Sequence, residues 1–136
     1  MPIEDDDHIR TLLSNAKTIA VVGASNKLLR DSNRIALFLK QKGYTVIPVN
    51  PNYSAIGEDR CYPDLQTIGM PVDIVDIFRN PEAVDEIIDD AIAARAKSIW
   101  MQLGVVNQIA AAKAEAAGLS VIMDHCIAVD YSRLMR

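Results

Sequence analysis

Five short apolar runs constrain the fold of this chain more than any other feature. They lie at residues 18–22, 44–49, 73–78, 98–101 and 119–123. A short run rich in β-branched residues, without polar alternation, is typical of a strand buried on both faces of a parallel sheet. Segments with helical periodicity separate the runs, so we expect βαβ units with right-handed crossovers. The sequence therefore predicts an α/β fold.

The helices between these runs are marked by capping residues and apolar stripes. An opening helix within residues 1–16 has acids at 5–7 that can cap it, and an apolar face that we expect to cover one edge of the domain. Residues 50–72 are rich in Pro, Asn, Gly and Asp, which predicts a loop with one short helix near 64–68. The remaining helices are expected at 34–42, from 80–82 onward, between Asn107 and Gly118, and within 124–136.

Five strands alternating with helices favour a doubly wound parallel sheet in the order 3-2-1-4-5, with helices on both faces. Ligands of such sheets bind at the carboxyl ends of the strands, near the point where the strand order reverses. The residues that follow the strands are therefore the candidate site: 23–25, 49–51, 78–79, 101–104 and 124–126.

Composition narrows the class of protein. At 136 residues the chain has the length of one domain, and we expect 1–136 to form a single one. A hydrophobic share of 50% with 24% charged residues favours a packed core over disorder. The net charge of −4 argues against bulk nucleic-acid binding.

Other features bear on compartment and metals. The N-terminus lacks the basic and apolar segments of a secretory signal, and no stretch reaches the ~20 apolar residues that span a bilayer. Cys61 and Cys126 do not have the Cys/His spacing of a zinc site, and scattered thiols suit a reducing compartment. We expect a cytoplasmic protein with no membrane contact and no metal site.

The turn after the first strand is a candidate phosphate site, because a glycine lets backbone approach phosphate and a helix N-terminus offers free N–H groups. Gly23 stands there, but the G-x-G-x-x-G pattern of dinucleotide folds is absent. Cations and hydroxyls follow it. They could surround a polyanion or belong to a solvated loop, and their spacing leaves both interpretations open. These residues are Ser25, Lys27, Arg30, Ser32 and Arg34.

The end of the second strand argues against NAD. An NAD site has Asp or Glu there to bind the ribose diol, ~20 residues beyond the glycine pattern. This chain has Val49, Asn50 and Pro51, with no acid and no adjacent cation that would hold a 2′-phosphate. Asn50 and the proline can line an adenine pocket, but they supply no carboxylate.

Taken in order, these segments resemble the small stand-alone CoA-binding proteins of bacteria and archaea. Those proteins are similar to the N-terminal CoA-binding domain of the succinyl-CoA synthetase alpha subunit, which has a Rossmann-like fold. Each segment is weak alone, but the ordered set is specific and covers nearly the whole chain. The segments lie at 22–25, 30–34, 48–51, 75–79, 100–104 and 121–126.

The resemblance implies that the cofactor is coenzyme A or an acyl-CoA. It assigns three groups of binding residues at the strand ends. The residues implied for the phosphates are Gly23, Ala24, Ser25, Arg30, Ser32 and Arg34. Those implied for adenosine are Val49, Asn50 and Pro51, and those for the pantetheine arm are Phe78, Arg79, Met101, Gln102 and Gly104.

The chain departs from the family pattern at three positions. Asp31 replaces a proline, and its carboxylate could weaken phosphate binding or pair with Arg30. His125 replaces an arginine, and Ile127 replaces a proline. His125 lies between an acid and a cysteine, but adjacent residues of an extended chain point to opposite faces. We therefore expect no catalytic residue there.

Three hypotheses about function follow. The first is a non-catalytic binding, carrier or sensor protein for CoA or acyl-CoA, with its protein partner left open. The second is an oxidoreductase using NAD(P), which the fold permits but the strand ends oppose. The third is an interaction module with a vestigial nucleotide site.

Overall fold

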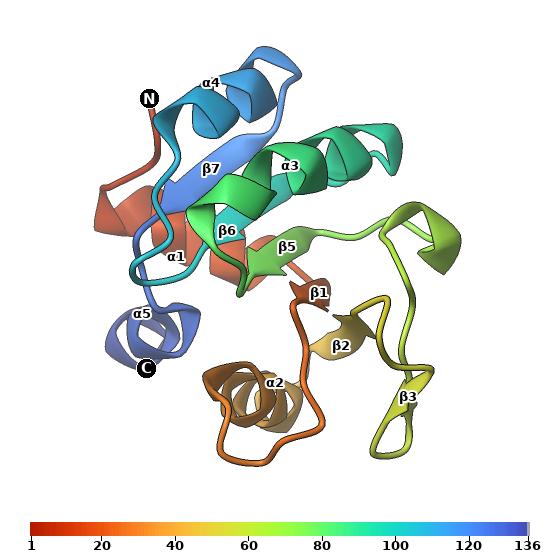
Figure 1. Ribbon diagram of the computed structural model, residues 1–136. Coiled ribbons are helices and arrows are strands. Elements are labelled where there is room, and N and C mark those ends of the chain that lie inside the picture. Colours follow the sequence, from red (N-terminus) through yellow and green to blue (C-terminus); the bar gives the residue numbers. More distant parts are fainter. Residues whose placement is uncertain (136) are drawn as a thin grey trace.

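The computed structural model describes residues 1–135. A five-stranded parallel sheet forms the centre of the molecule (Figure 1). All five predicted strands are present, and the α/β class is confirmed. The strands are β1 (Thr18–Val22), β2 (Thr45–Val49), β5 (Ile74–Ile77), β6 (Ser98–Met101) and β7 (Ser120–Met123).

Helices follow the strands, as the periodicity predicts. A two-stranded hairpin, β3 (Ala55–Ile56) with β4 (Asp59–Arg60), lies in the segment expected to be loop. The last residue of the expected C-terminal helix segment, Arg136, lies outside the described residues. The helices are α1 (Asp6–Asn15), α2 (Asp31–Gln41), α3 (Val84–Ala93), α4 (Gln108–Ala116) and α5 (Ile127–Leu134), with 3-10 turns η1 (Gln66–Ile68) and η2 (Pro81–Ala83).

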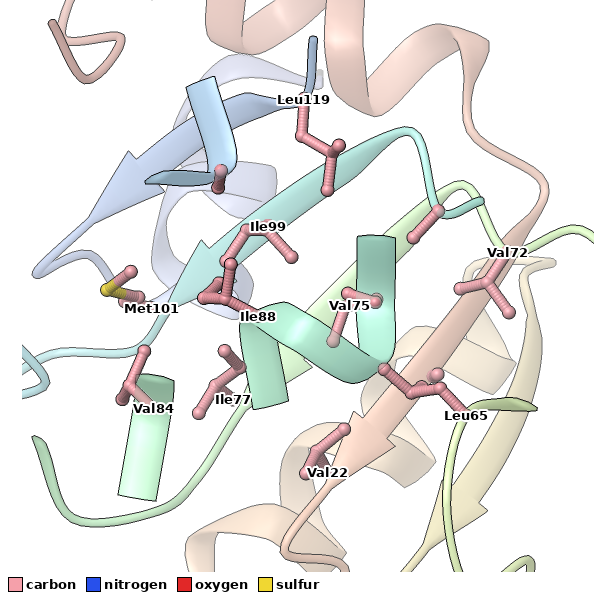
Figure 2. Close-up of a cluster of buried hydrophobic side chains, with 14 of the residues drawn as sticks. Val22, Leu65, Val72, Val75, Ile77, Val84, Ile88, Ile99, Met101 and Leu119 are labelled. Carbon is pink, nitrogen blue, oxygen red and sulfur yellow. The ribbon is translucent and has the colours of Figure 1, made fainter. Parts of the chain in front are cut away.

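One face of the sheet is covered by α3 and α4. Val84 and Ile88 of α3 are fully buried and pack in one cluster with Ile77 and Met101 of the strands (Figure 2). The small alanines of α4 complete this cluster, which lets that helix approach the sheet closely. Helices on this face connect β5, β6 and β7.

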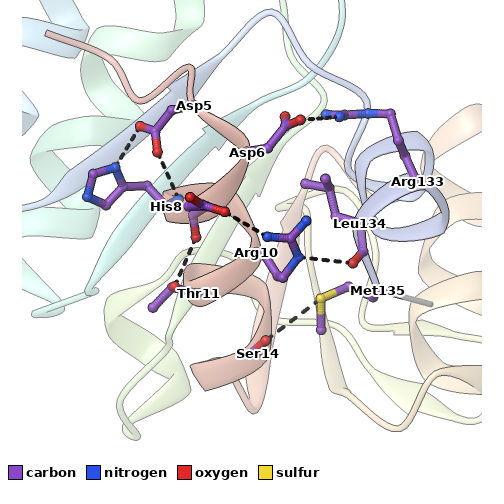
Figure 3. A network of polar contacts seen from close by, with 10 residues as sticks. Asp5, Asp6, His8, Arg10, Thr11, Ser14, Arg133, Leu134 and Met135 are labelled. Atoms are coloured by element: carbon purple, nitrogen blue, oxygen red, sulfur yellow. Dashed lines mark hydrogen bonds and ion pairs between the residues drawn. The ribbon is translucent and has the colours of Figure 1, made fainter.

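The opposite face is covered by α1, α2 and α5. Ile9 of α1 is fully buried in this second cluster. Polar contacts join α1 to the end of α5, as Figure 3 shows: Arg133 Nη1 lies 2.9 Å from the Asp6 carboxylate, and Arg10 Nε donates to the Leu134 carbonyl at 3.3 Å. The first helix is therefore held to the last one. Over residues 1–135, none of the helices combines the length and the apolar character needed to cross a bilayer.

The observed strand order differs from the expected order 3-2-1-4-5, which is wrong. The sheet runs β2-β1-β5-β6-β7, which is 2-1-3-4-5 when its strands are counted along the chain. This is the other common order of a doubly wound sheet. Pro48 explains why β2 lies at the edge: it has no N–H to donate to a second neighbour, and its carbonyl on that side accepts from Tyr62 N at 3.0 Å. All residues of β5 are buried, as a central strand requires.

A second difference concerns the start of α2. The helix begins at Asp31, not at residue 34, with Arg30 as its extended N-cap residue. An acid in the first turn is favourable there because it faces the positive end of the helix dipole. The loop after Gly23 is therefore shorter than expected, and Ser32 belongs to the helix.

The observed order moves the point at which the order of the strands reverses. From β1 the chain continues to β2 on one side and later to β5 on the other, so the reversal lies between β1 and β5. In the expected order, the residues after β6 would have adjoined Gly23. In the structure, the residues after β5 do.

Candidate functional site

Gly23 occupies the point where the ends of β1, β2 and β5 meet. Its N–H donates to the Val49 carbonyl at 3.0 Å, and Phe78 N donates to the Val22 carbonyl at 2.8 Å. The backbone at Gly23 has φ +88°, and a Cβ built there would lie 2.5 Å from the Phe78 carbonyl oxygen. Because real Cβ atoms do not approach so closely, glycine is required at this position.

A cavity of about 450 Å³ opens beside Gly23, between the β1–α2 loop and the segment after β2. It brings together seven of the residues predicted for the site: Gly23, Ala24, Ser25, Arg30, Ser32, Asn50 and Phe78. The sequence interpretation did not assign Lys27, Leu29 or Tyr53 to the site, although they also line this cavity. Lys27 was visible as a loop cation, whereas Leu29 and Tyr53 carry no local signal of binding.

The N-terminus of α2 faces this cavity without a cap. The N-cap residue, Arg30, makes no capping hydrogen bond with its side chain. Ser32, in the first turn, lines the cavity, and its hydroxyl has no partner among residues 1–135. The side chains of Lys27 and Arg30 likewise form no ion pair within the described chain. Unpaired N–H groups, a hydroxyl and two cations together make a site suited to an anion.

Hydrogen bonds hold the loop after Gly23 in place. Asn50 Nδ2 donates to the Ala24 carbonyl at 2.9 Å, and Asn33 Nδ2 donates to the Ser25 carbonyl at 2.8 Å. The Ser25 hydroxyl accepts from Lys27 N at 3.1 Å. The loop is therefore ordered before any ligand arrives, which lowers the entropic cost of binding.

Asp31, which stands where the family pattern has a proline, pairs with Arg34 and not with Arg30. The Arg34 guanidinium lies against the Asp31 carboxylate one turn along α2, and both side chains are mostly exposed. The pair with Arg30, one of two alternatives that the sequence left open, is therefore not formed. Arg30 and Asp31 both line the cavity, but Asp31 is neutralised by Arg34, which does not line it, so Arg30 stays unpaired there.

A second cavity of about 480 Å³ lies on the other side of Gly23 and Asn50. Val49 and Pro51, predicted for adenosine, line it together with Arg79. Its remaining charged residues are acidic and come from α3 and the segment before η1: Asp64, Glu86, Asp89 and Asp90. The two cavities therefore differ in charge, and the phosphate-compatible one is the first.

Met101, Gln102 and Gly104 line neither cavity. Met101 is fully buried in the core, and the Gln102 amide oxygen accepts from Ile127 N at 3.0 Å, which anchors the start of α5. Gly104 N donates to the Asp124 carboxylate at 2.7 Å. These residues lie one strand further from Gly23 than expected, because β5 stands between β1 and β6.

Asp124 and His125 link the end of β7 to other segments through their side chains. His125 Nδ1 lies 2.7 Å from the carboxylate of Asp130, one turn into α5. Asp124 has φ 62°, an uncommon conformation outside glycine, and its carboxylate is engaged by Gly104. Asp124 and His125 thus have separate partners. Ile127, at the other departure from the family pattern, is fully buried at the start of α5.

One buried carboxyl was not singled out by the sequence interpretation. Asp76, in the middle of β5, is fully buried, and neither of its oxygens has a hydrogen-bond partner among the described residues. Burial raises the pKa of this carboxyl well above its usual value. An acid within an otherwise apolar run was the available signal, and it is an exception to the rule that buried polar groups are paired.

Comparison with known proteins identifies the family. The family described as CoA binding domain matches residues 17–132. The chain belongs to this family. The resemblance seen in the sequence is therefore confirmed. The matched span contains all five strands of the sheet and both cavities.

Two similar proteins have nearly the same length as this chain. The uncharacterized protein YneT of Bacillus subtilis (strain 168) is 34% identical over 124 residues, covering 91% of this chain and 92% of YneT. A hypothetical protein from Pyrococcus horikoshii OT3 has a solved structure that matches with a TM-score of 0.95 and 37% identity, covering 100% of this chain and 97% of that one.

Two similar proteins are much longer enzymes. Acetate–CoA ligase (ADP-forming) II of Archaeoglobus fulgidus is 36% identical over 74 residues, which are 53% of this chain and 11% of the ligase. The apo structure of the dinucleotide-forming acetyl-coenzyme A synthetase 1 of Ca. Korarchaeum cryptofilum matches with a TM-score of 0.73 and 25% identity, covering 82% of this chain and 27% of that one. This chain thus corresponds to a small part of each.

Proposed function

We propose that this protein binds coenzyme A or an acyl-CoA at the carboxyl edge of its sheet, as a non-catalytic binding, carrier or sensor protein. The diphosphate lies in the first cavity, against Gly23, Ala24 and Ser25. Arg30 and Ser32 add charge and a hydroxyl donor there. Guanidinium groups suit this ligand because they hold phosphate oxygens through two parallel hydrogen bonds.

The observation that carries the proposal is the N-terminus of α2, without a side-chain cap, opening into a cavity whose lining includes the unpaired cations Lys27 and Arg30 beside the ion-paired Asp31. A helix N-terminus without a capping side chain leaves N–H groups that an anion can satisfy. Membership of the CoA binding domain family supports coenzyme A as the source of that anion. The role of Phe78 and Arg79 toward the pantetheine arm is part of the same proposal. Val49 and Pro51 line the second cavity, outside the one proposed for the phosphates.

The end of β2 favours CoA over NAD(P). Asn50 stands where a dinucleotide site has its carboxylate, and its amide is already engaged by the Ala24 carbonyl and by Asn52 N. An amide held in this way is not free to accept both hydroxyls of a ribose. The phosphate side of the cavity, by contrast, keeps its donors unpaired.

The test is thermal stabilisation of the purified protein by CoA, dephospho-CoA, NAD and NADP, measured side by side. A ligand at 100 times its Kd adds about 2.7 kcal/mol to the stability of the folded state, which shifts the melting temperature visibly. We expect a shift with CoA and little with NAD or NADP. A shift only with NAD or NADP would instead favour an oxidoreductase.

Arg30→Ala and Arg34→Ala form a matched pair for this test. Both remove an exposed guanidinium from the start of α2, but only Arg30 lines the cavity. We expect Arg30→Ala to weaken CoA binding about tenfold or more, as the loss of a charge-assisted contact does. Arg34→Ala should weaken it less, because it acts only through the Asp31 carboxylate that it leaves unpaired. Equal losses would contradict the placement of the phosphates.

A further inference from the structure

We propose that Leu29 and Tyr53 enclose the nucleobase of the bound ligand, so that the first cavity holds the adenosine diphosphate half of the molecule. This inference rests on the proposed function and deepens it. It assigns a binding role to two residues outside the predicted site, one from the β1–α2 loop and one from the segment after β2. Figure 1 shows both segments leaving the same edge of the sheet.

The tip of the β1–α2 loop carries two exposed leucines between two cations. Leu28 and Leu29 are 77% and 88% exposed, and they stand between Lys27 and Arg30. Only Leu29 lines the cavity. Its side chain supplies an apolar wall at a site whose neighbouring groups are charged or carry hydroxyls. A phosphate gains nothing from such a wall, whereas an apolar part of the ligand does.

Tyr53 supplies a second apolar wall from the other loop. Its backbone N–H donates to the Asn50 carbonyl at 3.3 Å, which holds it close to the end of β2. The side chain is half-buried, and it has no ring, cation or hydrogen-bond partner among residues 1–135. An aromatic ring without such a partner can stack on a planar base, which stabilises the binding of the base.

The position of these two residues points to the base and not to the pantetheine arm. Both share the cavity with Asn50, at the end of edge strand β2. The diphosphate site at the start of α2 lines the same cavity, so base and diphosphate can occupy it together. A flat base fits between an aromatic ring and a leucine, whereas the pantetheine arm is a flexible chain without a planar face.

The experiment is calorimetric titration of the full chain with CoA, ADP and 4′-phosphopantetheine. The variants are Leu29→Ser and Tyr53→Ser, with Leu28→Ser as the matched control. We expect Leu29→Ser to raise the Kd for CoA and for ADP about tenfold, because covering one leucine is worth about 1.5 kcal/mol. Tyr53→Ser should act in the same direction. Binding of 4′-phosphopantetheine, which has no base, should stay unchanged.

Several outcomes would overturn the inference. If Leu29→Ser binds CoA as the unaltered protein does, Leu29 makes no contact with the ligand. If it weakens 4′-phosphopantetheine and spares ADP, the leucine covers the arm and not the base. If Leu28→Ser has the same effect, the loop acts as a whole. The failure of the proposed function is distinguishable, because the unaltered protein would then bind no CoA. Both leucines are exposed, so these variants are expected to fold.

Discussion

At the scale of single residues, Gly23 shows how one position links fold and site. Gly23 and Gly43 both have positive φ, +88° and +97°, but only Gly23 faces a close neighbour, the Phe78 carbonyl at 2.5 Å from a built Cβ. We expect Gly43→Ala to lower the free energy of unfolding by about 1 kcal/mol, from backbone strain alone. Gly23→Ala adds a steric overlap at the site and should lower it by about 3 kcal/mol or more. Urea unfolding measures both free energies. Equal losses would show that the Phe78 carbonyl moves away from the added methyl group at little cost in free energy.

At the scale of elements, the helices differ in how their N-termini are satisfied. Asn107 caps α4, because its Oδ1 accepts from Ala110 N at 3.0 Å, whereas α2 has no side-chain cap. Helices α3 and α5 also lack a side-chain cap, but neither begins at the first cavity as α2 does. We interpret the contrast between α4 and α2 as a division between a structural helix and a helix that receives a ligand. Asn107→Ala should therefore lower the free energy of unfolding by about 1 kcal/mol. The stabilisation by CoA should stay as it is in the unaltered protein.

Gln108→Ala is the control for this prediction. Gln108 is the first residue of α4, is exposed, and makes no capping contact. Alanine there should leave the free energy of unfolding nearly unchanged. If Asn107→Ala also reduced the thermal shift with CoA, α4 would contribute to the binding site and the division between the two helices would be wrong.

At the scale of the whole molecule, Asp76 makes stability depend on pH. Its pKa in the folded protein is raised above the usual 3.8 by burial, so between these two pKa values the folded state keeps a proton that the unfolded state has lost. The contribution to stability is therefore largest below the unfolded pKa. It falls as pH rises toward the folded one, by about 1.4 kcal/mol per pH unit.

Asp76→Asn should remove this dependence, because the amide does not ionise. From pH 5 to pH 8, we expect the unfolding free energy of the unaltered protein to fall relative to that of the variant. Glu86→Gln neutralises an exposed carboxylate and should leave the pH profile unchanged. Parallel profiles for Asp76→Asn and the unaltered protein would show that Asp76 does not keep its proton.

Local patterns in the sequence were enough for the five strands of the sheet and the fold class, but not for the β3–β4 hairpin or the first residue of α2. Apolar runs such as 73–78, and capping residues such as Asn107, act over a few neighbouring positions, so their signals are readable along the chain. The residues around Gly23 were found in the same way, because a glycine after a strand marks a turn. The family resemblance added coenzyme A, which no local pattern specifies.

The strand order and the membership of the cavity depended on contacts between distant segments. Pro48 was a signal that β2 lies at the edge, but which strand adjoins β1 is a matter of pairing across the sheet. That pairing places Phe78 beside Gly23 and leaves Gln102 to anchor α5. Leu29 and Tyr53 share a cavity only because two loops leave the same edge of the sheet. Spacing along the chain does not encode such proximity, since it arises when the strands assemble.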